Sequence, residues 1–426
     1  MKTRYFNEIL QGISNLKNSA TRALCLLSLA AAAPIAMAQT SPSQALINAG
    51  FDNVASFVAE KPAPLGQSPI QAVYASIENN GYRGNHRAIC KALQVLAQAH
   101  PADEYHLLVL ENGTPRVVVV GKQTAGQWDV TTSYDTAELA KQLKATKSPT
   151  ATSSYGKIDI NLHPILMIDN FKLDKIFDFA IFAAPSIETT LWKGNRTYFQ
   201  PIFPLVHNLP KGHPDRTPQV GILGLRQDWV NNKHWDLSTS LGTFLYNRYG
   251  IHANLTYHIN RYLDFGVRAG LTGDQLITGQ GWKFGKAKEL MAMAHVDYYN
   301  PATSLQVKLS GGRFLYGDYG TRLDVIRHFG EITVGAYAMY TDGESNGGFT
   351  FAIPISPRSQ VRKGAVRLHM GEYFGLEYSA KNYYDWLEQR RGQNYRERPD
   401  NPHTSHYWQA AYLEQYVERY LNGYIK

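Results

Sequence analysis

The chain has 426 residues, a formal charge of +8 at pH 7 and 44% hydrophobic residues, so it is too long for one small domain and too apolar to be disordered. The basic residues form no block, which gives nucleic-acid binding little support. Tyrosine dominates the aromatic residues, with 27 Tyr against 7 Trp and 17 Phe. This bias suits surfaces that meet both lipid and water, or carbohydrate, as well as tyrosine-rich globular proteins.

The N-terminus has the three zones of a secretory signal peptide. In "RALCLLSLAAAAPIAMAQT", Arg22 precedes an apolar run at residues 23–33, and the small residues "AMA" follow at 36–38. We expect cleavage after Ala38 and export from the cytoplasm, because the apolar run is too short to span a membrane as a helix. Removing residues 1–38 takes away four basic residues and one acidic residue, which lowers the formal charge from +8 to +5. Cys90 is then the single cysteine, so no internal disulfide is expected.

A small α+β domain is predicted over residues 41–146. It contains a short helix after Ser43, strand-like runs such as "IQAVYASIE" and the amphipathic stretch "GNHRAICKALQVLAQAH". "EYHLLVLENGTPRVVVVGK" indicates a hairpin, because Asn112-Gly113 can supply a left-handed turn between two β-branched runs. The helical stretch "DTAELAKQLKAT" closes the domain, and "KSPTATSSYG" at 147–156 is a predicted linker.

Beyond the linker, helical periodicity nearly vanishes and segments of period two follow one another over residues 157–385. In "IHANLTYHIN", for example, Ile251 and Ile259 lie on the face opposite to His252 and His258. A soluble sandwich or barrel would turn such apolar faces inward, whereas an outer-membrane barrel turns them toward lipid. Runs of about nine to eleven residues that often end in aromatic residues favour the membrane barrel. We therefore predict a β-rich chain with a transmembrane antiparallel β-barrel of about 12–14 strands, a small N-terminal periplasmic α+β domain and a C-terminal helix.

In such a barrel the polar strand faces line the lumen. The candidate lumen-facing residues are His252, His258, Asp264, Arg268, His295, Asp297 and Lys308. Their mixed charges suit a hydrated sugar polymer better than a strongly selective anion pore.

Residues 386–426 are predicted to form a polar segment, "RRGQNYRERPDNP", followed by an amphipathic helix. Trp408, Tyr412, Tyr416 and Tyr420 follow one another at helical spacing. We expect this helix to dock on the α+β domain or on the base of the barrel and to expose tyrosines that assist contact with a partner.

The stretch "GGRFLYGDYG" at 311–320 places four glycines in the most strand-like region of the chain. Glycine supplies the positive φ angles of tight turns, so we expect residues 317–320 to reverse the chain between neighbouring strands. Gly311 and Gly312 would permit a bulge or close packing on the strand itself. This interpretation is structural and involves no chemistry.

The same stretch also resembles a known family. The residues of this motif turn are Gly312, Arg313, Phe314, Leu315, Gly317, Asp318, Gly320 and Asp324. The likeness continues through Thr321, Leu323, Arg327, Phe329, Val334–Ala336, Thr341, Asp342 and Ile353–Ile355, and more weakly back through "GLRQDWVNNKHWDLSTSLGTFLYNRYG". In order and spacing these residues resemble the YjbH-type (GfcD-like) outer-membrane proteins of exopolysaccharide biosynthesis and export.

The resemblance implies a β-barrel in the outer membrane of a Gram-negative bacterium that takes part in exopolysaccharide or capsule secretion, as a conduit or docking component for the polymer. The implied partners are exopolysaccharide, outer-membrane lipid and a periplasmic polysaccharide-export (Wza-like) protein, with no nucleic acid. The chain is much shorter than the usual members. This leaves open whether it forms a conduit alone, as an oligomer or with a second barrel protein.

An enzyme is not expected. The sequence has no Gly-x-Ser-x-Gly elbow and no His-Glu-x-x-His pair, and "GQGWKFGK" has the wrong spacing for a phosphate loop. The 14 histidines are scattered singly, so no metal site and no cofactor is expected. A general porin or a structural barrel is the main alternative. A barrel hydrolase is less favoured, although catalytic groups can converge from distant strands.

Overall fold

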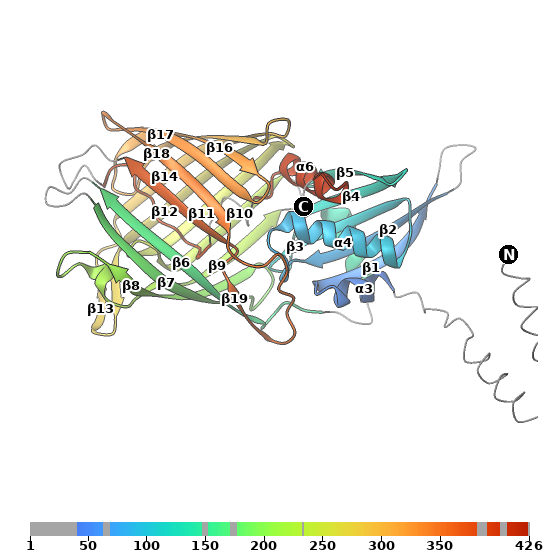
Figure 1. The fold of residues 1–426 in the computed structure, drawn as a ribbon, viewed down its shortest axis with the longest axis horizontal. Coiled ribbons are helices and arrows are strands. Elements are labelled where there is room, and N and C mark those ends of the chain that lie inside the picture. Colours follow the sequence, from blue (N-terminus) through green and yellow to red (C-terminus); the bar gives the residue numbers. More distant parts are fainter. Residues whose placement is uncertain are drawn as a thin grey trace, which may run out of the picture. The chain divides into compact units, whose positions relative to one another are not determined.

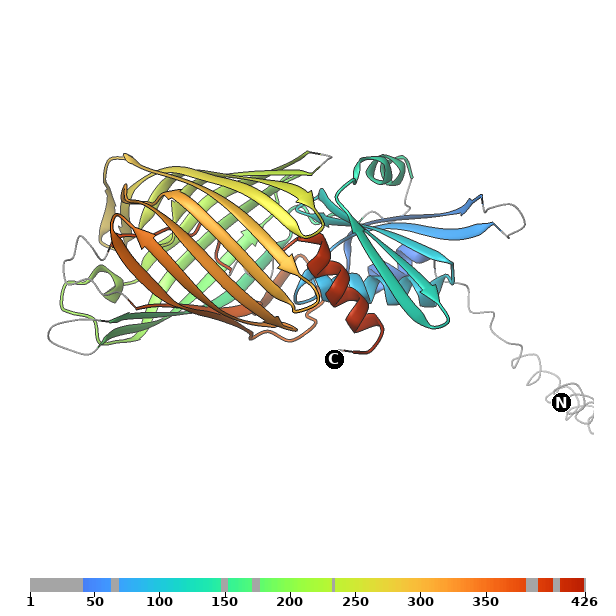
Figure 2. The same ribbon diagram turned by 90° about the horizontal axis from the view of Figure 1, so that it is seen from above.

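The protein is β-rich and contains two sheets (Figures 1 and 2). The computed structural model describes residues 41–62, 69–146, 152–170, 177–231, 234–380, 390–400 and 407–424. The predicted signal peptide and residues 147–151 of the predicted linker lie outside these ranges. Pro42–Lys426 form one compact unit, which contains both sheets.

The smaller sheet has five strands in the order β1-β2-β3-β4-β5. They are β1 (Asp52–Lys61), β2 (Ile70–Glu78), β3 (Glu104–Glu111), β4 (Thr114–Thr124) and β5 (Gln127–Ser133). β2 and β3 are parallel, and α4 (Asn85–Ala99) makes the crossover that a parallel pair requires. Between β3 and β4, Asn112 and Gly113 have positive φ angles of 52° and 72°. The predicted hairpin turn is therefore confirmed.

Helices pack on both faces of the five-stranded sheet. α3 (Pro42–Asn48), α4 and α6 (Ala410–Leu421) share one apolar cluster with alternate strand residues such as Leu107 and Val109. α5 (Ala137–Ala145) packs through Leu139 and Leu143 on the intervening residues of the opposite face. Among the described residues, no helix is both long enough and apolar enough to cross a membrane.

The predicted C-terminal helix is present as α6, but the prediction that it exposes its tyrosines is wrong. Tyr412 and Tyr416 are 3% and 1% exposed, and they pack into the cluster that α3 and α4 share with the five-stranded sheet. Cys90 on α4 lies in the same cluster. The aromatic stripe is therefore the packing face of the helix, because large apolar side chains gain most free energy when they leave water.

His86 lies between α4 and α6, where it is 1% exposed and stacks on the Tyr420 ring at 5.5 Å between ring centroids. Burial, with smaller contributions from Arg87 and Arg83 and against the opposing effect of Glu331, lowers the pKa of its imidazole to about 4. The folded protein therefore holds this ring neutral at pH values where the unfolded chain binds a proton.

We expect stability to fall as pH decreases from about 6.5 to about 4, because protons bind the unfolded state more strongly there. From pH 7 to pH 5 this single group should remove about 2 kcal/mol of unfolding free energy. His86→Phe should flatten this part of the pH profile, as measured by chemical unfolding in detergent followed by tryptophan fluorescence. His100→Gln, at the C-terminal end of α4, is the matched control. An unchanged slope in His86→Phe would contradict the assignment.

The larger sheet has 15 strands among the described residues. They are β6 (Ile158–Asn170), β7 (Phe177–Thr189), β8 (Asn195–His207), β9 (Gln219–Asn231), β10 (Trp235–Phe244), β11 (Arg248–Asn260), β12 (Leu263–Thr278), β13 (Gly281–Phe284), β14 (Glu289–Asn300), β15 (Leu305–Arg313), β16 (Tyr319–Phe329), β17 (Ile332–Thr341), β18 (Glu344–Pro354), β19 (Val366–Met370) and β20 (Tyr373–Ala380). From β6 to β18 the chain is an antiparallel meander, and a 3₁₀ turn at Pro214–Arg216 precedes β9.

One stretch of chain joins the two ends of this strand order. β19 pairs in parallel with β6, the Gly371 amide donates to the Leu162 carbonyl at 2.8 Å, and β20 then pairs antiparallel with β18. β19 and β20 are therefore two halves of one segment, whereas β13 is a four-residue strand that pairs with β12 beside the main strand order. When β19 and β20 are counted as one strand and β13 is left out, the 15 strands become 13, within the predicted 12–14.

On the large sheet, apolar residues are exposed and polar residues are buried, which is the reverse of the usual arrangement in a soluble protein. On β11, Ile251 and Ile259 are 55% and 47% exposed, whereas His252 and His258 are 2% and 4% exposed. β17 alternates exposed and buried residues along its whole length. Other exposed residues include Leu225, Leu241, Val267, Leu290, Val296, Leu309, Leu323, Val325 and Val334. The apolar face is thus accessible, and charged residues lie on the opposite, buried face.

Exposed aromatic residues lie beside the turns at both ends of these strands. At the end that contacts the five-stranded sheet they are Trp192, Trp229, Trp235, Tyr262, Tyr298 and Phe329, and at the other end they are Tyr246, Phe284, Tyr319 and Tyr340. Tyr299, the neighbour of Tyr298 on β14, is fully buried instead and packs beside Tyr412.

Candidate functional site

The buried face of the large sheet carries a dense set of charged and hydroxyl side chains, called here the polar interior. Its buried members include Asp159, Ser186, Glu188, Arg226, Asp228, Ser238, Arg248, His252, His258, Asp264, Thr272, Asp297, Gln306, Asp324 and His328. Strand alternation aligns them, since every second residue of a strand points to the same side. Buried charges are costly unless they are paired, so their partners decide what this face can do.

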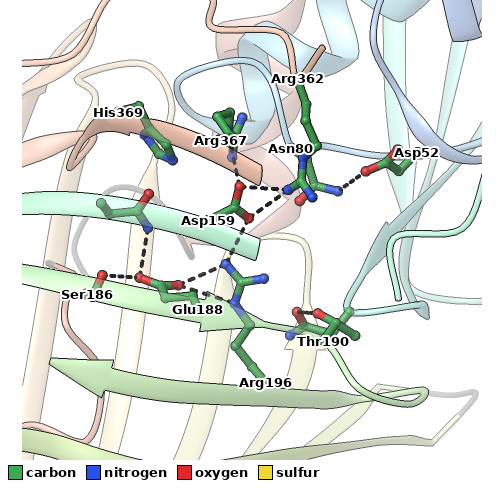
Figure 3. A network of polar contacts seen from close by, with 12 residues as sticks. Asp52, Asn80, Asp159, Ser186, Glu188, Thr190, Arg196, Arg362, Arg367 and His369 are labelled. Carbon is green, nitrogen blue, oxygen red and sulfur yellow. Dashed lines mark hydrogen bonds and ion pairs between the residues drawn. The ribbon is translucent and has the colours of Figure 1, made fainter. Parts of the chain in front are cut away.

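Asp159 on β6 is the centre of an ion network at the first strands of the sheet (Figure 3). It is 1% exposed and accepts hydrogen bonds from Arg362 at 2.7 Å, from Arg367 at 2.9 Å and from Arg196 at 3.4 Å. Strand register explains the arrangement, because Arg367 on β19 and Glu188 on β7 are the cross-strand partners of Asp159. Arg196 on β8 also binds Glu188 at 2.9 Å.

A serine, a histidine and a glutamate meet beside this network, but not in the geometry of a hydrolase. The Ser186 hydroxyl donates to Glu188 Oε1 at 2.6 Å and lies 3.1 Å from His163 Nε2. In a catalytic triad the carboxylate orients the histidine, whereas here it binds the serine directly. Ser186 is also 0% exposed. This trio is therefore part of the structural network.

Two cavities adjoin the polar interior. A cavity of about 140 Å³ is bordered by Asp159, Glu188, Arg196 and Trp408, among others. A cavity of about 170 Å³ is bordered by His258, Asp264, Asp297 and Trp408, among others. Carboxylates, guanidinium groups and aromatic rings line both, which is a suitable surface for water and polyhydroxylated molecules. The described residues contain no group of three or more His, Cys, Asp and Glu side chains that could hold a metal ion.

Residues of the five-stranded sheet reach this region from one end of the large sheet. Arg116 on β4 forms ion pairs with Asp228 at 3.1 Å and with Asp236 at 3.4 Å. The Tyr134 ring, which follows β5, stacks on the His258 ring with centroids 3.8 Å apart and planes 5° apart. The contact is therefore made by side chains of both sheets, most of them buried.

A second ion-pair contact joins α4 to the turn between β16 and β17. Arg83, just before α4, and Arg87 bind Glu331 in this turn at 2.7 Å and 2.6 Å. Burial by itself raises the pKa of the Glu331 carboxyl, but hydrogen bonds from the two arginines outweigh it and lower the pKa to about 2. Glu331 is thus charged at every physiological pH.

The predicted lumen-facing residues all lie on the polar interior, and the structure brings several of them together. His258 contacts Asp264 at 2.8 Å and Asp236 at 3.2 Å. Asp297 and Lys308 are cross-strand partners. His295 lies against Gly266, where an added Cβ would approach its ring to 2.2 Å.

The remaining two predicted residues, His252 and Arg268, both contact the polar segment near the C-terminus. The His252 ring accepts or donates a hydrogen bond with the Tyr395 hydroxyl at 2.9 Å, and Arg268 donates to the Tyr395 carbonyl at 2.9 Å. Arg268 and His252 also lie 3.3 Å and 3.8 Å from the Glu397 carboxylate. These contacts could not be predicted, because residues 390–400 have no periodicity.

The motif turn differs in position from its prediction. β15 ends at Arg313 and β16 begins at Tyr319, so the reversal comprises residues 314–318 and not 317–320. Phe314 and Leu315 fold inward and are 0% and 1% exposed. The shift arises because these two side chains occupy an apolar cluster with Tyr395, which takes them out of the strand.

The individual motif residues have structural contacts. Gly317 has a φ of 101°, and the Arg313 guanidinium donates to the Leu290 carbonyl. At Gly312 (φ 145°) and Gly320 an added Cβ would meet a carbonyl oxygen of the neighbouring strand at 2.3 Å and 2.1 Å, respectively. Asp318 accepts from the Gly392 amide at 2.7 Å, and Asp324 binds Arg322 at 2.7 Å.

Comparison with protein families identifies the family of this chain. A family model described as "Exopolysaccharide biosynthesis protein YbjH" matches residues 30–356, which is most of the chain. The chain belongs to the YjbH family. Its role is therefore related to exopolysaccharide biosynthesis, as the resemblance of the motif turn implies. The comparisons with curated proteins and with solved structures found no match.

The YjbH match ends before β19, so several residues of the polar interior lie beyond it. These include Arg362, Arg367, Tyr395, Glu397 and Trp408. Sequence reasoning missed the Asp159 network, although the alternation of Asp159, Asn161 and His163 in "KIDINLHPILM" was a usable signal for one polar face.

Proposed function

We propose that this YjbH-family protein is an outer-membrane β-barrel of a Gram-negative bacterium that serves exopolysaccharide or capsule secretion, as a conduit or docking component for the polymer. One observation carries the proposal. The large sheet exposes its Leu, Val and Ile side chains and buries its charges, which in water would leave an apolar surface far larger than soluble proteins tolerate. Lipid removes this cost when a sheet closes so that no edge is left unpaired.

Two further features support a membrane barrel. The segment that contains β19 and β20 pairs with both β6 and β18, so each terminal strand of the meander has a hydrogen-bonded partner on its outer edge. Exposed aromatic residues near both sets of turns match the two interfacial girdles of membrane barrels. In this proposal the five-stranded sheet lies in the periplasm, and residues 1–38 direct export.

Support for a polymer substrate comes from the family and from the chemistry of the polar interior. Mixed charges, hydroxyl groups and aromatic rings line both cavities. Such a surface can exchange hydrogen bonds with a hydrated sugar chain without binding it tightly. We propose that the five-stranded sheet contacts a periplasmic polysaccharide-export (Wza-like) protein, and that the chain is not an enzyme and carries no cofactor.

Fractionation and gel mobility test the membrane proposal. The expressed protein should be recovered with the outer membrane, and unboiled protein in detergent should migrate differently from boiled protein, because closed barrels resist unfolding by detergent. Recovery in the soluble periplasmic fraction with no mobility shift would overturn the proposal.

Deletion of the gene separates the polymer role from the alternatives. Loss of capsule or biofilm polymer is expected. Retained polymer with altered permeability to small solutes would favour a general porin, and hydrolysis of lipid or peptide by the purified protein would favour an enzyme.

A further inference from the structure

Residues 390–400 cross the polar interior of the large sheet. The Tyr395 side chain is 1% exposed, and its ring stacks on Phe244 of β10 at 5.2 Å between centroids, with 13° between the ring planes. Its hydroxyl meets His252 on β11, and its carbonyl accepts from Arg268 on β12. The Arg396 carbonyl accepts from the Leu245 amide at 2.9 Å. Three consecutive strands thus hold one side of the segment.

The other side of the segment is held by the motif turn and by β17. The Leu315 amide donates to the Gln393 carbonyl at 3.2 Å, and the Gly392 amide donates to Asp318 Oδ2 at 2.7 Å. Gly392 lies so close to Met339 on β17 that an added Cβ would approach its Cε to 2.2 Å. Both hydrogen bonds between the motif turn and this segment therefore come from the loop at 314–318.

These contacts span the interior of the sheet. Phe244, Met291, Met293, Phe314, Leu315, Tyr337, Met339 and Tyr395 form one buried apolar cluster. In the strand order, β11, β12, β14, β15 and β16 lie between β10 and β17. Strands so far apart in the sheet can share a cluster only if the sheet curves around it. At the level of Tyr395, apolar side chains from distant strands therefore meet inside the curved sheet.

The segment is nevertheless held without strand pairing. Its contacts include single hydrogen bonds, the Arg268–Glu397 and Arg398–Glu111 ion pairs at 3.3 Å and 4.0 Å, and the Tyr395 ring packed in the apolar cluster. Each can be broken without separating two strands of the sheet. A segment bound in this way can leave while the sheet stays intact.

We infer that residues 390–400 are an internal plug and that the loop of the motif turn at 314–318 holds this plug in place. Passage of the polymer then requires the plug to move. This inference rests on the proposed barrel. It also assigns a role to the glycine-rich motif. The reversal at Gly317 allows Phe314 and Leu315 to fold inward and pack against Tyr395 of the plug.

Ion conductance across planar lipid bilayers tests the plug. Tyr395→Ala removes the central ring, and Glu397→Gln removes the charge that Arg268 and His252 face. Both variants should raise conductance several-fold above that of the parent protein. Tyr395→Phe keeps the ring and should raise it less. Conductance equal to that of the parent protein in both Tyr395→Ala and Glu397→Gln would overturn the inference.

A disulfide provides the converse test. In a Cys90→Ala background the mature chain has no other cysteine, and Leu245→Cys with Arg396→Cys should crosslink, because a backbone hydrogen bond already joins the two residues. The oxidised protein should stay at low conductance even when Glu397→Gln is added, and reduction should restore the increase.

The control pair is Glu60→Cys with Gln71→Cys, which are cross-strand partners in the five-stranded sheet. Its oxidation should leave conductance unchanged. Full conductance with the Leu245–Arg396 crosslink closed would overturn the plug. Failure of the protein to enter bilayers at all would instead overturn the proposed barrel, so the two failures are distinguishable.

Discussion

Replacing Asp159 by alanine should destabilise the protein by about 3–5 kcal/mol, the usual cost of removing one partner from a buried ion network. The carboxylate is 1% exposed and binds Arg196, Arg362 and Arg367. Without it, three guanidinium groups would face one another after losing the carboxylate that binds all three. Because Arg367 lies on β19 and Asp159 on β6, the loss should fall on the parallel pairing of β6 with β19.

Urea unfolding of the protein in lipid vesicles would measure this effect. Asp274→Asn is the matched control, because Asp274 also binds an arginine, Arg248, but its side chain is 72% exposed. An exposed carboxylate contributes little to an ion pair, and the buried Arg248 keeps its second carboxylate partner, Glu289, at 3.0 Å, so this variant should unfold almost as the parent protein does. Equal effects of the two substitutions would show that the Asp159 network does not hold the sheet together.

The period of two predicted which strand residues share a face. It assigned His252, His258, Asp264 and Asp297 to one side of their strands, and all four are buried on the side opposite to the exposed apolar residues. Alternation alone could not say which side faces lipid or water, because a soluble barrel and a membrane barrel have the same pattern. The exposed fractions of the apolar residues show only that the apolar side points outward.

Residues that depend on long-range register could not be predicted. Arg367 meets Asp159 only because β19 pairs in parallel with β6, a pairing between segments some two hundred residues apart that no local pattern signals. Tyr395 meets His252 and Arg268 from an aperiodic segment. Such contacts are set by tertiary packing and have no signature in composition or spacing.

The errors near the motif turn and in α6 have a common cause. The glycines correctly indicated a reversal, but Phe314 and Leu315 left the strand to pack beside Tyr395. The tyrosine spacing correctly indicated a helix, but Tyr412 and Tyr416 face α4 and the five-stranded sheet. In both places the local pattern predicted the backbone, and the availability of an apolar partner decided where the side chains lie.

A single arginine substitution can test whether the exposed apolar face of the large sheet contacts lipid, and its effect on stability should be large. Val267 is 39% exposed and lies near the middle of the pairing between β11 and β12. If this face contacts lipid, Val267→Arg should cost about 2–4 kcal/mol, because a cation near the middle of the bilayer loses its hydration. The adjacent Arg268, on the opposite face, binds Glu397 and the Tyr395 carbonyl. A positive charge would therefore be tolerated at one residue and not at its neighbour.

Val58→Arg is the matched control, since Val58 on β1 of the five-stranded sheet is 43% exposed. A comparably accessible valine that contacts water should accept arginine within about 0.5 kcal/mol. Unfolding in lipid vesicles should then separate the two variants clearly. If both substitutions were equally harmless, Val267 would face water, and the exposed Leu, Val and Ile residues of the large sheet could no longer be explained by a surrounding membrane.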